Sequence, residues 1–258
     1  MIMERNMHHH RPYRNTDEGK FVPLLGKTGY HISISREPFS WKEWLMMTMQ
    51  GKGLLAVWTD IPAHIEEDFN HWYDEEHLAE RAGIAGFLNV RRYVSLQGTP
   101  KYFALYDTVD AQVLQSDTYL KVLNNSTPWT QRVRPHFQNF VRNEYELILT
   151  VGTISEKASP YVLLVRLGIP PEHEAEFNDW YNTDHVPALA SVPGVYGARR
   201  YRATAGSPAY LAVYEMAHAD IRTSDAWRKA ADSPWTLRMR RLYRDLAANF
   251  GQLIKAMP

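Results

Sequence analysis

The sequence carries the same segment twice. The stretch at 69–93, FNHWYDEEHLAERAGIAGFLNVRRY, aligns with the stretch at 177–201, FNDWYNTDHVPALASVPGVYGARRY, at a constant offset of 108 positions (185 − 77). The alignment continues through the Tyr-x-Ala-x-Tyr pattern at 102–106 and 210–214. A period of about 100 residues is too long for the unit of a solenoid or a propeller. The chain therefore contains a duplicated domain.

Each repeat shows the same order of periodicities. In the first repeat, a short apolar run at 53–58 predicts a strand, and apolar residues at helical spacing predict a helix over 62–81. Strand-like runs, a second helical stretch and a last strand follow, at 87–94, 101–107, 111–123 and 137–149. The order β-α-β-β-α-β is that of the α+β ferredoxin-like fold, in which two helices cover one face of a four-stranded antiparallel sheet. The open faces of two such sheets can cover each other and close into a barrel.

We divide the chain into an N-terminal extension, a first repeat and a second repeat, at 1–52, 53–150 and 160–256. In the extension, Ser40 and Glu43 have the spacing of a capping box, followed by Trp41 and Trp44 on one helical face. This pattern predicts an amphipathic helix that packs on the barrel, and a lid over a cavity is the alternative. The run MHHHRPYRN contains three histidines that could bind a metal, although a floppy chain end is the simpler interpretation.

Composition and charge argue against several classes of function. The 258 residues include 29 basic and 29 acidic side chains, so the net charge is zero and no field favours nucleic acid or an anionic membrane. The chain has no cysteine, which removes disulfides, a thiolate nucleophile and cysteine metal clusters. We find no apolar run that could span a bilayer and no signal-sequence pattern, so we expect a cytoplasmic protein. Serine-hydrolase, Walker, dinucleotide-binding and HExxH patterns are missing as well.

The phrases WYDEEH and WYNTDHVPALASVPGV, each followed by RRY, resemble the EthD-like group of the dimeric α/β-barrel superfamily, over roughly residues 53–256. The second repeat is closer to the pattern because it has Val186-Pro187 where the first repeat has Leu78-Ala79. The resemblance implies one barrel built from two ferredoxin-like halves. It also implies small-molecule chemistry such as polyketide cyclisation, cofactor-free oxygenation, lactone isomerisation, decarboxylation or haem handling. Such a resemblance does not choose among these reactions.

Two histidines are candidate acid–base groups. The spacing Phe-x₃-Tyr-x₃-His places aromatic residues and a histidine on one helical face in each repeat, ending at His77 and His185. We expect Pro187 to end the second helix, so that terminal carbonyls favour a protonated His185 while burial opposes it. The pattern predicts that His185, with His77 as its counterpart, acts as a general acid or base near neutral pH, and a helix-capping role is the alternative. Asp184 points about 100° away from its neighbour, which argues against a directly bonded acid–histidine pair.

The third strand of each repeat alternates tyrosines with apolar residues. We expect the apolar side chains to lie under the helices and the tyrosines to face the barrel interior, where hydroxyls can stabilise a substrate carbonyl or phenolate. The alternative is that the tyrosines only pack between the sheets. The candidates for catalysis are Tyr210 and Tyr214, and the candidates for substrate binding are Tyr73, Tyr181, Tyr102 and Tyr106.

The first strands of the two repeats differ at one position, where Trp58 aligns with Arg166. We expect Arg166 to hold an anionic substrate in a second cavity and Trp58 to fill or stack in a first cavity. The neighbouring arginines at 91–92 and 199–200 must point to opposite faces of their strands, and for most of them we expect surface salt bridges.

These features predict a cofactor-independent acid–base enzyme of lyase, cyclase, isomerase or decarboxylase type, acting on a small aromatic or polyketide-like molecule in the barrel cavity. His185 would move the proton, Tyr210 and Tyr214 would stabilise an enolate or phenolate, and Arg166 would orient an anionic group. A cofactor-free oxygenase and a non-catalytic binding protein for a hydrophobic ligand or haem are the alternatives. We expect no cofactor, metal, nucleic acid or membrane partner, and pairing of two chains into a homodimer through the outer helices stays open.

Overall fold

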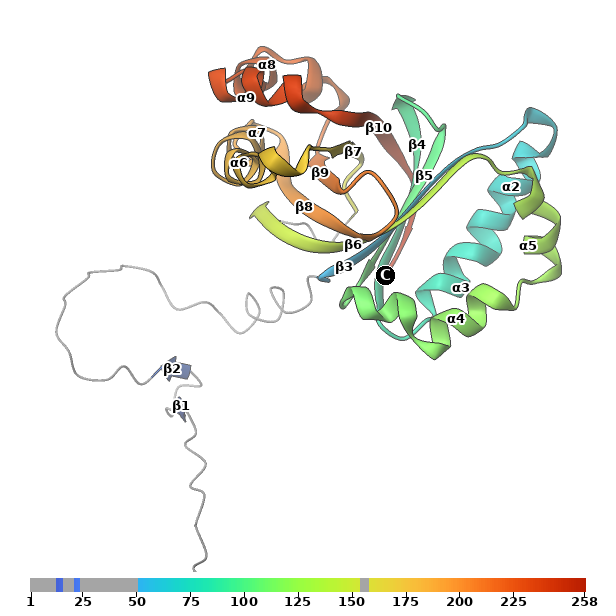
Figure 1. Cartoon of the computed structure of the whole chain (residues 1–258). Coiled ribbons are helices and arrows are strands. Elements are labelled where there is room, and N and C mark those ends of the chain that lie inside the picture. Colours follow the sequence, from blue (N-terminus) through green and yellow to red (C-terminus); the bar gives the residue numbers. More distant parts are fainter. Residues whose placement is uncertain (1–12, 16–20, 24–50, 154–157) are drawn as a thin grey trace, which may run out of the picture. The chain divides into compact units, whose positions relative to one another are not determined.

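The computed structural model describes residues 13–15, 21–23, 51–153 and 158–258 (Figure 1). These residues belong to two units, divided between Trp41 and Lys42. In the first unit, β1 (Tyr13–Asn15) pairs antiparallel with β2 (Phe21–Pro23). The helix predicted after Ser40 and the three adjacent histidines lie outside the described residues. The second unit contains both repeats.

Eight strands of the second unit close into one antiparallel barrel. The first repeat contributes β3 (Gly53–Asp60), β4 (Phe87–Gln97), β5 (Tyr102–Thr108) and β6 (Gln138–Gly152), and the second contributes β7 (Tyr161–Gly168), β8 (Val195–Ala205), β9 (Tyr210–Met216) and β10 (Arg244–Met257). The order around the barrel is β10-β4-β5-β3-β6-β8-β9-β7, and β7 pairs with β10 to close it. The last strand of each repeat pairs with the second strand of the other repeat. The predicted α+β architecture of two ferredoxin-like halves is confirmed, and one chain closes the whole barrel.

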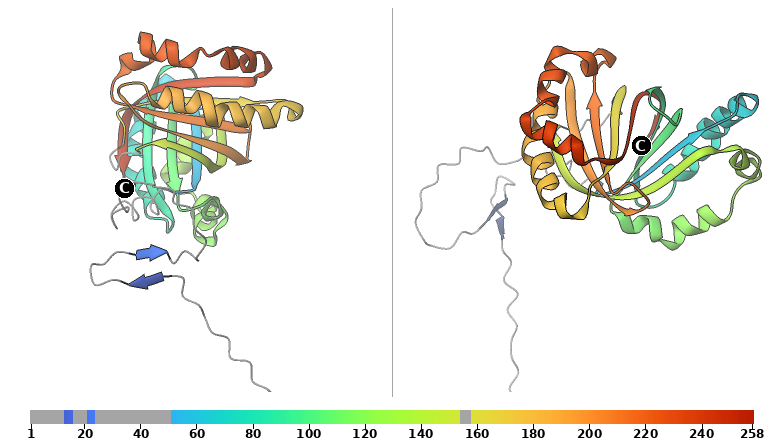
Figure 2. Two further views of the ribbon diagram at one scale, coloured as in Figure 1. Left: turned by 90° about the vertical axis from the view of Figure 1, so that its left-hand side faces the viewer. Right: turned by 45° about the horizontal axis from the view of Figure 1, so that its top comes forward.

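Helices cover the outer face of each half, on opposite sides of the barrel (Figure 2). In the first repeat they are η1 (Ala63–Ile65), α2 (Glu66–Trp72), η2 (Tyr73–His77), α3 (Leu78–Ala82), η3 (Ala111–Gln115), α4 (Asp117–Asn124), α5 (Pro128–Val133) and η4 (Arg134–His136). In the second they are η5 (Pro171–His173), α6 (Glu174–Trp180), η6 (Tyr181–His185), α7 (Val186–Ala190), η7 (Ala219–Thr223), α8 (Asp225–Ala231), α9 (Pro234–Met239) and η8 (Arg240–Leu242). Thr127 caps α5 and Ser233 caps α9, in each case just before a proline that suits the first helical position.

The first long helix of each repeat contains a π-helical turn that ends at the histidine, η2 and η6. After η6 the helix continues as α7, which has Pro187 in its first turn and ends at Ala190. The prediction that the helix ends at Pro187 is therefore wrong. A π-turn inserts one extra residue, so one carbonyl lacks its usual amide partner, and a proline without an N–H fits there at little cost. Turns of this kind are frequent at functional sites.

Apolar side chains form three layers. One layer fills the barrel interior, with Trp58, Tyr93 and Phe103 among its members. The other two lie between each half of the sheet and its helices, and they contain the four tyrosines of the third strands, Tyr102, Tyr106, Tyr210 and Tyr214. The predicted orientation of these strands is therefore wrong. The interior takes the face that carries the apolar residues of these strands. The hydroxyls of three of the four tyrosines have polar partners on the helices, as Tyr102 does by donating to Glu66 at 2.8 Å.

A cluster of four charged residues lies in the barrel interior. Arg91 donates to Asp107 at 2.6 Å and to Glu215 at 3.0 Å, and Arg199 donates to the same two residues at 3.0 and 2.7 Å. All four side chains are buried. Burial opposes ionisation of the carboxyls, but the two arginines hold the pKa of Asp107 and of Glu215 below the usual values. The prediction of surface salt bridges is wrong for this pair of arginines, because each one bridges the acids of both repeats inside the barrel.

Candidate functional site

Trp58 and Arg166 meet inside the barrel. The guanidinium carbon of Arg166 lies 4.0 Å from the centre of the Trp58 ring, and both side chains are buried. Burial lowers the pKa of Arg166, and the aromatic face compensates part of its charge. The two side chains share one place, so the prediction of two separate cavities is wrong. A role for either residue in substrate binding stays a prediction.

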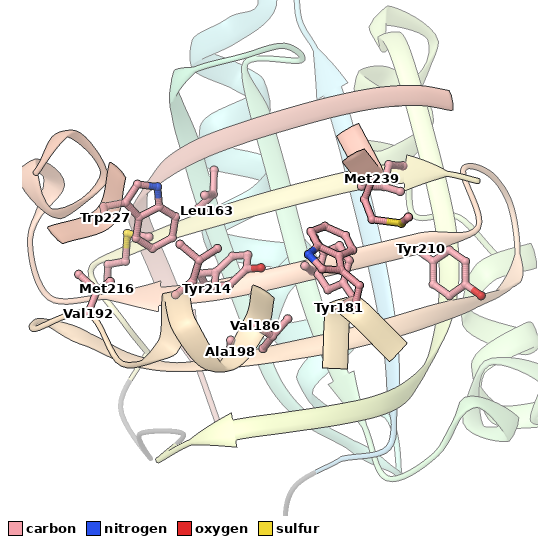
Figure 3. Close-up of a cluster of buried hydrophobic side chains, with 14 of the residues drawn as sticks. Leu163, Tyr181, Val186, Val192, Ala198, Tyr210, Tyr214, Met216, Trp227 and Met239 are labelled. Carbon is pink, nitrogen blue, oxygen red and sulfur yellow. The ribbon is translucent and has the colours of Figure 1, made fainter. Parts of the chain in front are cut away.

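Several of the predicted site residues come together instead between η6 and the sheet of the second repeat (Figure 3). His185 stacks on Trp180, with ring centres 4.6 Å apart, and meets Tyr181 edge-on at 5.2 Å. Tyr214 on β9 and Trp227 on α8, whose rings are 5.6 Å apart, belong to the same layer. The π-turn places Tyr181 and His185 on this layer together.

Two hydroxyls connect His185 to a partly exposed carboxylate. Nδ1 of His185 lies 3.3 Å from Oγ1 of Thr236, which lies 3.0 Å from Oγ of Ser233, and Ser233 donates to Asp184 at 2.6 Å. Thr236 also accepts the indole N–H of Trp180 at 3.2 Å. The absence of a direct Asp184–His185 bond was predicted, but the connection through the first turn of α9 was missed. The repeated Thr/Ser-Pro-Trp-Thr sequence before and within α5 and α9 is the signal that could have revealed it.

Burial keeps both imidazoles neutral. It lowers the pKa of His185 to about 4, and Arg240 acts in the same direction. It also lowers the pKa of His77 well below the usual value, with Arg81 and Arg92 adding to the effect. The predicted balance near neutral pH is wrong, because the helix continues past the histidine and no terminal carbonyls offset the loss of solvent. A neutral imidazole is the form that can accept a proton.

His77 lacks the connection that His185 has. It stacks on Trp72 with ring centres 4.3 Å apart, but its buried Nδ1 has no hydrogen-bond partner among residues 51–153 and 158–258. The nearest carboxylate oxygen belongs to Glu80, at 3.7 Å. Thr130, the counterpart of Thr236, accepts the indole N–H of Trp72 at 3.0 Å. The first repeat therefore has the equivalent threonine without the bond to the histidine.

Arg92 and Arg200 lie under the helices, on the outer face of the sheet. The guanidinium carbon of Arg200 lies 4.6 to 4.9 Å from three ring centres, those of Phe177, Tyr181 and Tyr210. Only 1% of Arg200 is exposed, as is only 1% of Arg92. The expected surface position is wrong for this pair as well, because the helices and the tyrosines of the third strands cover both side chains. Arg92 still forms a salt bridge, with the partly exposed Asp74. The guanidinium of Arg200 and the imidazole of His185 both contact the ring of Tyr181.

Buried tyrosines under the helices of both repeats are neutral phenols. Burial raises the pKa of Tyr106 and of Tyr214 well above the usual value, so both remain protonated at neutral pH. The hydroxyls of Tyr73 and Tyr106 are 2.9 Å apart. Tyr210 donates to Glu174 at 2.5 Å at the edge of the sheet. Both catalytic candidates on β9 lie in the layer of His185, and the ring centre of Tyr210 is 4.8 Å from the guanidinium carbon of Arg200.

Solved structures share this architecture, although no protein-family model and no curated protein matches the sequence. An anthrone oxidase-like protein superposes with a TM-score of 0.61 at 11% identity, covering 81% of this chain and 94% of that chain. A mutant chlorite dismutase from Candidatus Nitrospira defluvii in complex with cyanide superposes with a TM-score of 0.55 at 12% identity, covering 84% of this chain and 96% of that chain. A candidate monooxygenase from Fusobacterium nucleatum subsp. nucleatum superposes with a TM-score of 0.54 at 10% identity, covering 80% of this chain and 94% of that chain.

The chain has the dimeric α/β-barrel fold. At 10 to 12% identity these similarities fix the fold and leave the reaction open. Among the described residues of the barrel, no group of three or more histidines and acidic residues could hold a metal ion. No helix in the same part of the chain has the length and apolar character needed to cross a membrane.

The layer around His185 does not fit haem. An axial ligand must direct an imidazole nitrogen into an open slot as large as a porphyrin. Here the imidazole is 8% exposed and stacked on Trp180, and buried Tyr181, Tyr214 and Met239 belong to the same packed cluster. A depression of about 460 Å³ lies elsewhere in this dimeric α/β barrel, over α2 of the first repeat, with Asn70, Asp74, Lys101 and Tyr102 in its lining.

Proposed function

We propose that this protein is an acid–base enzyme for a small aromatic or polyketide-like carbonyl compound, with its chemistry in the layer between η6 and the sheet of the second repeat. The observation that carries the proposal is the hydrogen-bonded series from His185 through Thr236 and Ser233 to Asp184. A histidine that only caps a helix needs one carbonyl partner. This histidine is bound through hydroxyls to a carboxylate that can stabilise its charged form.

The hydrogen-bond valences indicate which imidazole nitrogen is free. Ser233 donates to the carboxylate of Asp184, so its oxygen accepts from Thr236, and the hydroxyl proton of Thr236 points to Ser233. Oγ1 of Thr236 then accepts from Nδ1–H of His185. Nε2 of His185 is left with a lone pair and is the atom that accepts a substrate proton. Asp184 stabilises the resulting imidazolium through the polarised hydroxyls.

The reaction begins when Nε2 removes a proton from the carbon next to a substrate carbonyl. The electron pair of the broken C–H bond moves to the carbonyl oxygen and forms an enolate or phenolate. Tyr214, a neutral phenol, would stabilise that negative charge together with the cation Arg200, which contacts the ring of Tyr181. Return of the proton to another carbon gives an isomer, and expulsion of a leaving group from the carbon beta to the carbonyl gives a lyase product. A decarboxylase would form the same enolate by loss of carbon dioxide in place of the proton, and the enolate would then take up a proton.

A cofactor-free oxygenase is the second candidate. It is favoured by the similarity to the anthrone oxidase-like protein, as an analogy of fold. The first step is the same, because a substrate carbanion must form before it can reduce molecular oxygen. Consumption of oxygen together with substrate distinguishes the oxygenase from the lyase and isomerase outcomes.

The test is a ligand screen followed by proton exchange. Thermal shift against phenolic acids, aromatic ketones and polyketide intermediates finds ligands, and each hit is then incubated in deuterated water and analysed by mass spectrometry. We expect His185→Gln to slow exchange or conversion by roughly 10² to 10⁴-fold, the usual contribution of a general base. The matched variant His77→Gln should change the rate by less than about threefold, because His77 lacks the hydroxyl connection.

The proposal is wrong if His185→Gln exchanges and converts the hits as fast as the wild-type protein does. A hit that binds both proteins and stays chemically unchanged would instead support a binding protein. A Soret band in the purified protein would support the haem-binding alternative, against the close packing around His185.

A further inference from the structure

Arg92 and Arg200 occupy equivalent positions but have different partners. Arg92 donates to Asp74 at 3.1 Å and to Asn70, so a carboxylate neutralises its charge. The residue equivalent to Asp74 is Asn182 (74 + 108), and Arg200 donates to it at 2.8 Å. The first repeat therefore pairs its buried cation with an anion, and the second repeat offers a neutral amide in the same place.

Arg200 retains unused donors. Its Nε and Nη2 are buried and have no hydrogen-bond partner in the described part of the chain, where no carboxylate comes within ion-pair distance of the guanidinium. Burial lowers the pKa of Arg200, so a bound anion would stabilise its charged form. Nε–H and Nη2–H point in parallel from one edge of a guanidinium, which is the arrangement that binds both oxygens of a carboxylate.

The unpartnered donors of Arg200 favour a carboxylate, and the aromatic rings around Arg200 favour an aromatic ligand. Phe177, Tyr181 and Tyr210 surround the guanidinium with aromatic faces at 4.6 to 4.9 Å. Such faces favour a flat aromatic ligand and compensate part of the charge while no ligand is bound. Tyr181 also contacts His185, so an aromatic ligand held by Arg200 would extend toward the imidazole.

The first repeat indicates where such a ligand would enter. The depression over α2 is lined by Asn70, Asp74 and Tyr102, and all three residues also contact Arg92. The equivalent residues of the second repeat are Asn178, Asn182 and Tyr210. By analogy with the first repeat, a ligand of Arg200 would enter between α6 and the start of β9.

We infer that Arg200 is the anion-binding residue of the second repeat and that its ligand is a small aromatic carboxylate. This inference deepens the proposed function by naming the substrate class, and it rests on the same layer as that function. The negative group that was expected at Arg166 is assigned to Arg200 instead, because Arg166 is stacked on Trp58 within the barrel.

The test is isothermal titration of the full chain with 4-hydroxybenzoate, with neutral 4-hydroxybenzamide as the comparison. We expect saturable binding of one 4-hydroxybenzoate, with the amide weaker by roughly tenfold or more. Asn182→Asp supplies the carboxylate that the second repeat lacks. The variant should therefore bind 4-hydroxybenzoate at least about tenfold more weakly, and the new ion pair with Arg200 should raise the melting temperature.

The inference is overturned if 4-hydroxybenzoate shows no saturable binding, if the amide binds equally well, or if Asn182→Asp binds as the wild-type protein does. Failure of this inference can be told apart from failure of the proposed function, because His185→Gln should keep the affinity for 4-hydroxybenzoate within about twofold. Saturable binding of 4-hydroxybenzoate, with no exchange or conversion of any hit of the ligand screen, would contradict the proposed function alone. Chemistry that survives in Asn182→Asp would contradict the Arg200 site alone.

Discussion

The two halves of the barrel share one symmetric cluster of charges in the interior, whereas under the helices the equivalent histidines and arginines have different partners. In the interior, Arg91 and Arg199 each bind the acids of both repeats, so a change in one repeat leaves charges of the other without partners. Under the helices, each repeat packs most of its own sheet on its own helices, and the ends of β6 and β10 reach the layer of the other repeat. The comparison teaches that charges bonded across both repeats stay symmetric, whereas under the helices His185 and Arg200 differ in their partners from His77 and Arg92.

The largest predicted effect tests the shared interior. Replacing Arg91 by methionine leaves part of the charge of Asp107 and Glu215 uncompensated in the barrel, and we expect a loss of about 3 to 5 kcal/mol in the free energy of unfolding. Arg199→Met should cost about the same, because the cluster is symmetric. Urea denaturation measures both. If either variant lost less than about 1 kcal/mol, or if the two differed by several, the four charges would not be shared between the repeats.

A second prediction concerns the pH dependence of stability. The pKa of His185 falls from an unfolded value near 6.5 to about 4 in the folded protein, so the unfolded state binds more protons between these values. This contribution to stability is fully present above pH 6.5 and decreases as the pH falls toward 4. Between pH 7.5 and pH 5 it amounts to about 2 kcal/mol, by linkage.

Denaturation of wild-type protein and His185→Gln at pH 7.5 and at pH 5 measures this difference. The wild-type protein should lose more stability than the variant, by about 2 kcal/mol. Equal losses in both proteins would show that His185 is not held neutral by burial. His77→Gln should show a change of the same sign, because burial also lowers the pKa of His77.

The smallest predicted change in stability comes from replacing Thr236 or its counterpart Thr130, and the two variants should differ in activity. Thr236→Val and Thr130→Val each leave a buried tryptophan N–H without an acceptor, and each should cost about 1 to 2 kcal/mol. Only Thr236→Val should also slow deuterium exchange of a substrate, because only Thr236 contacts the histidine. If both variants lost the same stability and exchanged deuterium at the same rate, the hydrogen bond between Thr236 and His185 would have only a structural role.

The architecture was predictable from the sequence because the repeat and its periodicities depend on local spacing. The sequence could not predict which face of each third strand points into the barrel, since a tyrosine can face either a packed interior or a helix. The pattern Tyr-x-Ala-x-Tyr is compatible with both orientations. The π-turns were hidden because one extra residue in a helix changes no composition. The bonds between Arg91 and Glu215 join residues that meet only when the two sheets close.

The candidate site was predictable in part. The position of His185 on an aromatic helical face followed from its spacing, whereas its low pKa required knowledge of its burial. The replacement of Asp74 by Asn182 is visible in the aligned repeats, but its meaning depends on Arg92 and Arg200 lying beside those residues. The roles of Tyr210, Tyr214 and Arg166 in catalysis or binding remain predictions.

The most direct test of the central claim, that the second repeat carries the ligand site, is a crystal structure of the protein grown with 4-hydroxybenzoate. We predict the carboxylate within hydrogen-bond distance of Nε and Nη2 of Arg200, with the aromatic ring against Tyr181 and directed toward His185. Density for the ligand in the depression beside Lys101, or next to Arg166 inside the barrel, would contradict this claim.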